Sequence, residues 1–147
     1  MTRSNLLDRE PVASAAAAAG QLVPRVLGRV EGSKAGPTLI VVGGLHGNEP
    51  AGVVALQRLL PRLAADPGVL ASGRVVGLSG NRKALLEGRR YLEHDLNRYW
   101  LPERVEELRA GTGFLGGEDE ELRDLDREIL ALLDDAEGDV YLLDLHT

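Results

Sequence analysis

Two histidines and one glutamate are the residues of this sequence whose types and spacing best fit a chemical task. His46 and Glu49 stand three positions apart in the segment 43–50 (GGLHGNEP), where three glycines allow the backbone to turn sharply. His146 lies far along the chain. Two imidazoles and one carboxylate, with a fourth position open to water, form a known catalytic zinc arrangement. The set predicts one Zn²⁺ per chain, which would polarise a carbonyl and lower the pKa of water to about 7.

Each of these residues also has an ordinary structural interpretation. A His-x-x-Glu pair is a short motif with many metal-free occurrences, and a single histidine is more often a hydrogen-bonded core or surface residue. Position favours the metal interpretation, because both histidines come just after a predicted buried strand. His94, the third histidine, lies in a polar segment, and we expect it to be exposed. Asp144 shares a strand face with His146, so it could support that histidine or form an ordinary ion pair.

Charged and polar residues crowd the segment 89–98 (RRYLEHDLNR), which has no clear period and is predicted to be a loop. An arginine of this segment, Arg90 or Arg98, could clamp a carboxylate through two parallel hydrogen bonds. A second cation, or the amide of Asn97, could stabilise an oxyanion. Charge patterning by itself favours a solvated loop instead.

Strands and helices alternate along the chain in a way that would position these residues. Strands are predicted at 23–31, as an edge strand, and as buried apolar runs at 38–42, 74–78 and 140–145. Helices are predicted after Pro50 and at 101–110 and 119–135. The alternation predicts an α/β fold. Sites in such sheets form at the carboxyl ends of the strands, where both His46 and His146 would lie.

Composition excludes several classes of protein. The net charge of −6 argues against a nucleic-acid partner, which would require a basic face. Without cysteine, the chain can form neither disulfides nor thiolate metal sites. No apolar run approaches the roughly 20 residues of a membrane helix, so we expect no membrane partner and a cytoplasmic location.

Three motifs together resemble the succinylglutamate desuccinylase/aspartoacylase family, which is related to the zinc carboxypeptidases. The motifs are 43–52 (GGLHGNEPAG), 95–98 (DLNR) and 144–146 (DLH), in the order of the family. The resemblance covers 23–147 and implies the N-terminal part of a zinc hydrolase catalytic domain. Residues 1–22, which include an Ala-rich patch, are predicted to form a flexible arm before it. It implies a mixed, mostly parallel sheet flanked by helices, as in zinc carboxypeptidases.

The resemblance also implies a role for each site residue. The zinc ligands would be His46, Glu49 and His146. Asn97 and Arg98 would hold the carboxylate of the substrate, and Arg90 would polarise the scissile carbonyl. The reaction implied is hydrolysis of the amide bond of a small anionic N-acyl amino acid.

The sequence departs from the family pattern after the third ligand, as a truncated catalytic domain would. The family's general base is a glutamate on a later strand, and no glutamate here matches it. General-base catalysis is typically worth about 10²–10⁴-fold, so we expect this chain alone to be inactive or very weak. A zinc carboxypeptidase acting on peptides and a non-catalytic metal-binding fragment remain alternatives. Strand 140–145 would present an open apolar edge, which predicts self-association.

Overall fold

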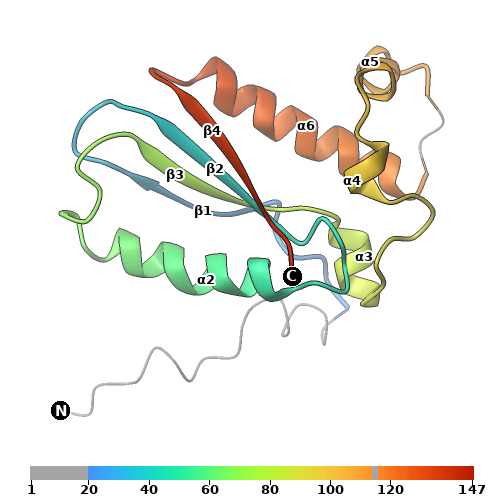
Figure 1. Ribbon diagram of the computed structural model, residues 1–147, viewed down its shortest axis with the longest axis horizontal. Coiled ribbons are helices and arrows are strands. Elements are labelled where there is room, and N and C mark those ends of the chain that lie inside the picture. The colour runs from blue at the N-terminus through green and yellow to red at the C-terminus, as the bar shows by residue number, and fades with distance from the viewer. Residues whose placement is uncertain (1–19, 114–115) are drawn as a thin grey trace, which may run out of the picture.

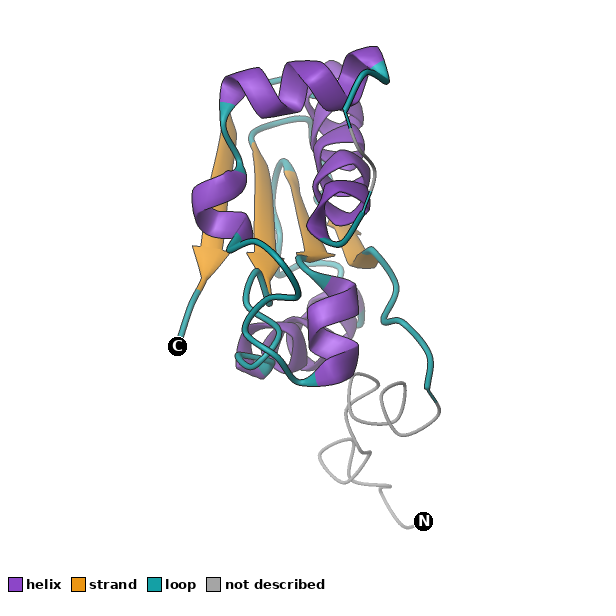
Figure 2. Ribbon diagram, turned by 90° about the vertical axis from the view of Figure 1, so that its right-hand side faces the viewer, coloured by secondary structure: helices purple, strands orange, loops and turns teal. Residues whose placement is uncertain are grey.

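A four-stranded sheet with helices on both faces forms the protein (Figure 1 and Figure 2). The computed structural model describes residues 20–113 and 116–147. The strands are β1 (Val26–Glu31), β2 (Thr38–Gly43), β3 (Arg74–Ser79) and β4 (Val140–Leu145), in the spatial order β1-β3-β2-β4. β2 runs parallel to β3 and β4, whereas β1 is antiparallel to β3. The predicted mixed, mostly parallel α/β sheet is confirmed.

Five helices are described, of which two short ones were not predicted. The helices are α2 (Ala51–Ala64), α3 (Arg82–Glu87), α4 (Leu96–Tyr99), α5 (Pro102–Ala110) and α6 (Glu118–Asp134). The side chain of Asn81 caps α3 by accepting a hydrogen bond from the Ala84 N–H, and Asp95 caps α4. Both short helices begin at such a cap and have too few turns to show an apolar period, so the pattern of the sequence did not reveal them.

Two hydrophobic layers hold the helices onto the sheet. On one face, the sheet packs against α6 and α5 through a layer that includes Ile40, Val42, Val76, Leu78, Val105, Leu108, Leu122, Leu125 and Leu132. On the other face, Leu56 and Leu60 of α2 pack with Val30 and Val41. Alternate residues of β2 therefore enter opposite layers, as expected for a strand buried on both faces. Full burial of a leucine such as Leu122 stabilises the fold by roughly 1.5–3 kcal/mol.

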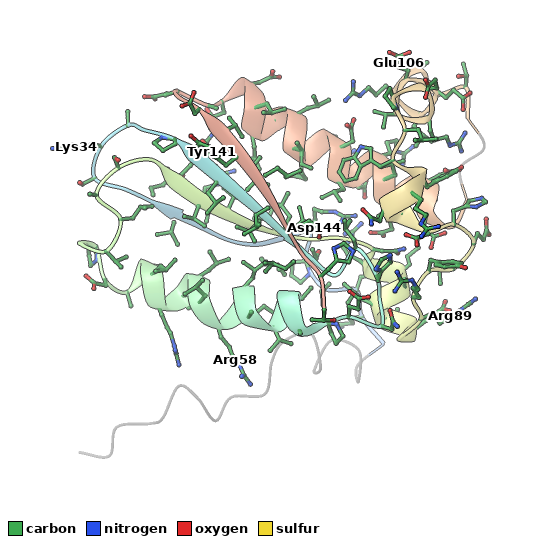
Figure 3. The ribbon with its side chains drawn as sticks, in the orientation of Figure 1. Lys34, Arg58, Arg89, Glu106, Tyr141 and Asp144 are labelled. Carbon is green, nitrogen blue, oxygen red and sulfur yellow. The ribbon has the colours of Figure 1, made fainter. Side chains whose placement is uncertain are left out.

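The prediction of a buried strand at 140–145 is wrong for its middle residues. β4 is the last strand in the order of the sheet, and Tyr141, Leu142 and Leu143 are 57%, 58% and 48% exposed. Leu142 is paired with Ile40 and so lies on the α6 side, whereas the alternate residues Tyr141 and Leu143 lie on the α2 side. Figure 3 labels Tyr141 on this strand. Apolar sequence indicates that a strand can be buried, but burial requires a neighbour, and β4 pairs only with β2 in the described part of the chain.

Most of the predicted N-terminal arm at 1–22 lies outside the described residues, which begin at Gly20. The first described residues, 20–22, are exposed, and Val23 is buried. Within the described ranges, no helix has both the length and the apolar character needed to cross a bilayer.

Candidate metal centre

The parallel pairing of β2 and β4 brings the two predicted histidine ligands to one edge of the sheet. Gly43 and Leu145 are paired in register at the carboxyl ends of these strands. The chain continues from these ends into His46 and His146, and Figure 2 shows the C-terminus beyond the end of β4. The two rings lie 4.8 Å apart between centroids, at an angle of 71°. The prediction that both histidines lie at one edge is therefore confirmed.

Glu49 reaches the same point because α2 begins directly against the ends of β2 and β4. A Cβ atom added to Gly43 would lie 2.7 Å from backbone atoms of Gly52 and Val53, so only glycine permits this approach. Glu49 Oε1 lies 3.3 Å from His46 Nδ1. His46, Glu49 and His146 can offer one ligand atom each within 4.8 Å of one another.

Each histidine ring has one nitrogen in contact with an aspartate carboxylate, which leaves the other nitrogen available to a metal ion. Asp95 Oδ1 lies 2.9 Å from His46 Nε2, and Asp144 Oδ2 lies 2.6 Å from His146 Nδ1. A ring nitrogen that donates to a carboxylate leaves the lone pair on the other nitrogen, which is the usual arrangement around metal-bound histidine. In that arrangement, His46 would present Nδ1 to a metal ion and His146 would present Nε2.

The Nδ1 atom of His46 is buried and lacks a hydrogen-bond partner in the described structure. The residue as a whole is 2% exposed. A buried polar atom left unpaired typically costs about 1–3 kcal/mol. A metal ion bound by Nδ1 would remove that cost. The donor set of two neutral imidazoles and one carboxylate fits Zn²⁺.

The carboxylates of the site experience different environments. The N–H of Thr147 donates to Glu49 Oε2 at 3.1 Å, and this hydrogen bond, the largest influence, lowers the pKa of Glu49. An ionised Glu49 is the form a metal ion requires. Burial would raise the pKa of Asp95, but the hydrogen bond with His46 and nearby positive charge outweigh it and lower the pKa. Burial dominates at Asp144 and raises its pKa.

Arg90 lies at the rim of this centre. One guanidinium nitrogen is 3.1 Å from Glu49 Oε1, while Nε is 3.9 Å from Asp95 Oδ2, and the side chain is half-exposed. The loop that carries Arg90 is fixed to the loop that carries His46, because the Gly47 N–H donates to the Arg90 carbonyl at 3.1 Å. A Cβ atom on Gly47 would lie 2.4 Å from the Arg89 carbonyl oxygen and 2.0 Å from the Ala84 carbonyl carbon of α3, so glycine is required where the His46 loop meets the Arg90 loop and α3.

The other predicted polar residues lie on or beside α4. Asn97 and Arg98 are exposed on this helix, two and three residues after Asp95, and their role in substrate binding stays a prediction. His94 is exposed as predicted, and its ring stacks on Tyr99 with centroids 4.5 Å apart. Figure 3 shows Arg89 in the loop before this segment and Asp144 toward the end of β4.

The contact between Asp95 and His46 is the feature of the site that residue types did not reveal. The two residues are 49 positions apart, and nothing in a loop aspartate indicates which histidine it will meet. The signal available in the sequence was the position of Asp95 at the head of the 95–98 motif, which also contains Asn97 and Arg98.

Comparison with known proteins identifies the family of the chain. The family model of the succinylglutamate desuccinylase/aspartoacylase catalytic domain matches residues 35–147. The chain belongs to this family. A succinylglutamate desuccinylase of Pseudomonas aeruginosa is 40% identical over 87 residues, which are 59% of this chain and 26% of that protein. One of Pseudomonas paraeruginosa is 34% identical over 112 residues, 76% of this chain and 31% of that protein.

A probable aspartoacylase of a Synechococcus species is 40% identical over 78 residues, which cover 52% of this chain and 24% of that protein. The chain thus spans about a quarter to a third of the length of these desuccinylase and aspartoacylase relatives. No solved structure matches it. The part matched by the desuccinylase/aspartoacylase domain includes every candidate site residue, from His46 to His146.

Proposed function

We propose that this chain carries the zinc-binding part of a hydrolase that cleaves the amide bond of small anionic N-acyl amino acids. The observation that carries the proposal is the buried, unpartnered Nδ1 of His46, which lies beside Glu49 and His146 in a compact set of potential ligands. The family supports amide hydrolysis, and the names of its desuccinylase and aspartoacylase relatives support the substrate class.

Zn²⁺ held by His46, Glu49 and His146 would supply Lewis-acid polarisation of a carbonyl and a lowered pKa for water. The protein's own contribution is to hold the donors in place. Asp95 and Asp144 fix the two rings, and the Thr147 N–H keeps Glu49 ionised. Fixed donors need little reorganisation when a metal ion binds.

The cationic residues are assigned to the substrate. Arg90 stands next to the proposed ligand Glu49, where its guanidinium can stabilise negative charge that develops on the scissile carbonyl oxygen. Arg98 and Asn97 are exposed on α4, where they can pair with a substrate carboxylate. These cationic and amide groups would favour an anionic substrate, although the chain as a whole has a negative net charge.

None of the residues given a role above serves as the general base. Within 20–113 and 116–147, the three carboxylates that contact the two histidines are Glu49, a proposed ligand, and Asp95 and Asp144, which each hold a ring. Each of these groups already has a task that needs its oxygens. We therefore expect zinc binding by residues 1–147 and weak or absent hydrolysis.

Zinc stoichiometry tests the ligand assignment. Purified protein should contain one zinc ion per chain, and His46→Ala or His146→Ala should abolish stoichiometric binding. His94→Ala is the matched control, because His94 is exposed and stacks on Tyr99, and it should retain full zinc. Wild-type zinc content in His46→Ala would refute the proposed centre.

Substrate class is tested by adding N-succinyl and N-acetyl amino acids or C-terminal dipeptides to the zinc-loaded protein. An amide hydrolase of the proposed kind, or its zinc-binding part, binds the N-acyl amino acids more tightly, as measured by calorimetry, and loses that preference in Arg98→Ala. Tighter binding of dipeptides would favour a carboxypeptidase instead.

A further inference from the structure

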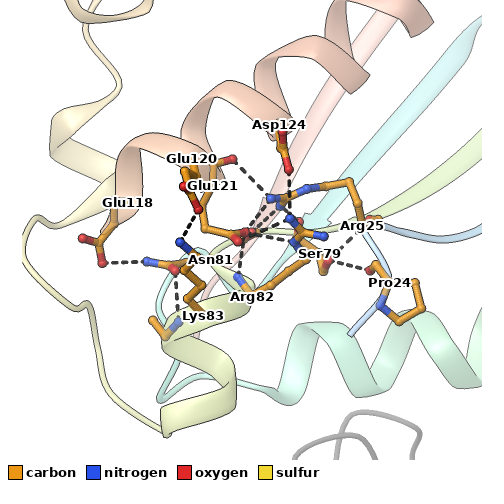
Figure 4. Close-up of polar contacts among 12 residues, drawn as sticks. Pro24, Arg25, Ser79, Asn81, Arg82, Lys83, Glu118, Glu120, Glu121 and Asp124 are labelled. Carbon is orange, nitrogen blue, oxygen red and sulfur yellow. Dashed lines mark hydrogen bonds and ion pairs between the residues drawn. The ribbon is translucent and has the colours of Figure 1, made fainter. Parts of the chain in front are cut away.

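Glu118, the first residue of α6, has a fully buried carboxylate and is neither a proposed metal ligand nor a proposed substrate-binding residue. Its two oxygens accept four hydrogen bonds. Oε1 accepts from the Leu92 N–H at 2.5 Å and from Asn81 Nδ2 at 3.0 Å, and Oε2 accepts from the N–H groups of Glu93 and His94 at 3.0 Å each. Figure 4 shows the contact with Asn81. Four donors on one ionised group form a strong and highly directional set of hydrogen bonds.

The three backbone donors are consecutive residues of the loop that leads to the metal centre. Arg90 lies two residues before Leu92, and Asp95 directly follows His94. The carboxylate of Glu118 therefore holds the loop between the residue that contacts Glu49 and the residue that contacts His46. A loop without such an anchor would satisfy these N–H groups with water and would move.

Asn81 extends the same anchor to the loop after β2. Its Oδ1 accepts from the Ala84 N–H, and its backbone N–H donates to the Gly44 carbonyl at 2.9 Å. Gly44 lies two residues before His46. One carboxylate thus fixes, directly or through Asn81, the segment that bears His46 and the segment that bears its aspartate partner.

The position of Glu118 at the start of α6 suits an ionised group. The N-terminus of a helix carries partial positive charge, which stabilises a nearby carboxylate. α6 is itself anchored to the sheet by Leu122 and Leu125, which are fully buried. The loop is consequently tied to a helix that is packed into the hydrophobic core.

We propose that Glu118 is a positioning residue of the metal centre, which holds the 90–95 loop so that Asp95 orients the His46 ring. The inference rests on the proposed function insofar as it concerns a metal. The orientation of the ring exists without one, so it can be measured separately. Glu118 acts on the His46 ring through other residues, because its carboxylate is hydrogen-bonded to the loop and to Asn81.

The test compares Glu118→Gln with Asp126→Asn. Gln keeps the shape of Glu118 but turns an NH₂ group toward backbone donors, whereas Asp126 is a buried carboxylate of the same helix whose partner is Arg109. In metal-free protein, the ring-nitrogen NMR signals of His46 should indicate a proton on Nε2 in the wild type and in Asp126→Asn. In Glu118→Gln, the His46 signals should indicate a mixture of ring tautomers. The amide hydrogens of residues 92–94 should exchange with solvent faster than in the wild type.

Zinc affinity, measured by competition with a chelator, gives the second readout. We expect a loss of about tenfold in Glu118→Gln, at the lower end of the range for outer-shell partners of metal ligands. Asp126→Asn should stay within twofold, and Glu118→Asp, which keeps the charge, should recover part of the loss. Unchanged His46 signals and unchanged affinity in Glu118→Gln would overturn the inference, as would an equal loss in Asp126→Asn.

The outcomes separate this inference from the proposed function. A wild-type protein that binds no zinc would refute the proposed function, while the His46 signals of Glu118→Gln would still decide the role of Glu118. If Glu118→Gln does not fold, Glu118→Asp decides by the same two readouts. The inference would then be contradicted by a folded Glu118→Asp variant in which the 92–94 amides have lost their protection from exchange. Its His46 signals and its zinc affinity would have to equal those of the wild type.

Discussion

Asp95 holds His46 by its Nε2 atom at 2.9 Å, and the ring in consequence turns its unpartnered Nδ1 toward Glu49 and His146. The same aspartate caps α4 by accepting the Asn97 N–H at 3.1 Å. One carboxylate therefore connects a proposed metal ligand to the helix that bears the proposed substrate-binding residues. Small movements of this group would alter both parts of the site.

Replacing Asp95 with Asn should weaken zinc binding by about 10–100-fold, the range for removal of a carboxylate behind a metal-bound histidine. Asn preserves the cap of α4, because its side-chain oxygen can still accept a hydrogen bond. The loss should therefore appear in chelator competition but hardly in thermal stability. Asp134→Asn, an exposed change in α6, is the control. Equal affinity in the two variants would show that Asp95 does not orient His46.

Glu118 should make stability sensitive to acid. Burial by itself would raise the pKa of this carboxyl, but the N–H groups of the loop and the Asn81 amide outweigh burial and lower the pKa below its ordinary value of 4.5. A lowered pKa in the folded state means that the stabilisation is complete above pH 4.5 and is lost as the pH falls toward the folded pKa. Urea unfolding should show wild type and Glu118→Gln differing most at neutral pH and converging as the pH falls below 4.5. A difference that does not depend on pH would contradict an ionised Glu118.

The buried pair of Arg25 and Glu121 should contribute more to stability than any exposed pair. Arg25 lies 2.5 Å from Glu121 and also donates to the carbonyls of Ser79 and Gly80, so it joins the start of β1 to α6 and the end of β3 (Figure 4). Glu121→Gln leaves the charge of Arg25 buried beside fewer acceptors, at a cost of about 3–5 kcal/mol in unfolding free energy.

A matched control for the buried pair is Glu87→Gln, which breaks the exposed pair with Arg89. This variant should change the unfolding free energy by about 0–1 kcal/mol. Urea denaturation measures both variants. A cost for Glu121→Gln as small as that of Glu87→Gln would contradict the prediction, because Arg82, the second cation that contacts Glu121, cannot replace the lost negative charge beside Arg25.

The outer edge of β4 should cause the chain to self-associate. Tyr141, Leu142 and Leu143 are exposed on a strand that has one described neighbour, and such an edge can pair with a second copy. Sedimentation velocity should detect concentration-dependent oligomers of the wild type, and Leu142→Lys should reduce them. Leu59→Lys, at a leucine of α2 that is 48% exposed, should leave them unchanged. A wild-type monomer at all concentrations would refute this prediction.

The apolar pattern by itself determined the main elements and their class. The runs at 38–42 and 74–78 are long enough, and apolar enough, to predict strands buried on both faces, and both are found. The leucines of α6 repeat at helical spacing, so this helix was predicted to within one residue at each end. These features depend on neighbouring residues in the chain, which a sequence displays directly.

The type and position of His46, Glu49 and His146 also indicated the candidate centre, because histidines placed after parallel strands lie at the same edge of the sheet. Only the structure showed that β2 and β4 are neighbours, which brings the two rings together. The exposed face of β4 was not determined, since burial depends on what lies against a strand. The partners of His46 and of the 92–94 amides were decided only by the tertiary structure. Asp95 and Glu118 meet them through folding of distant segments, and a polar residue in a sequence does not indicate the direction in which its hydrogen bonds will point.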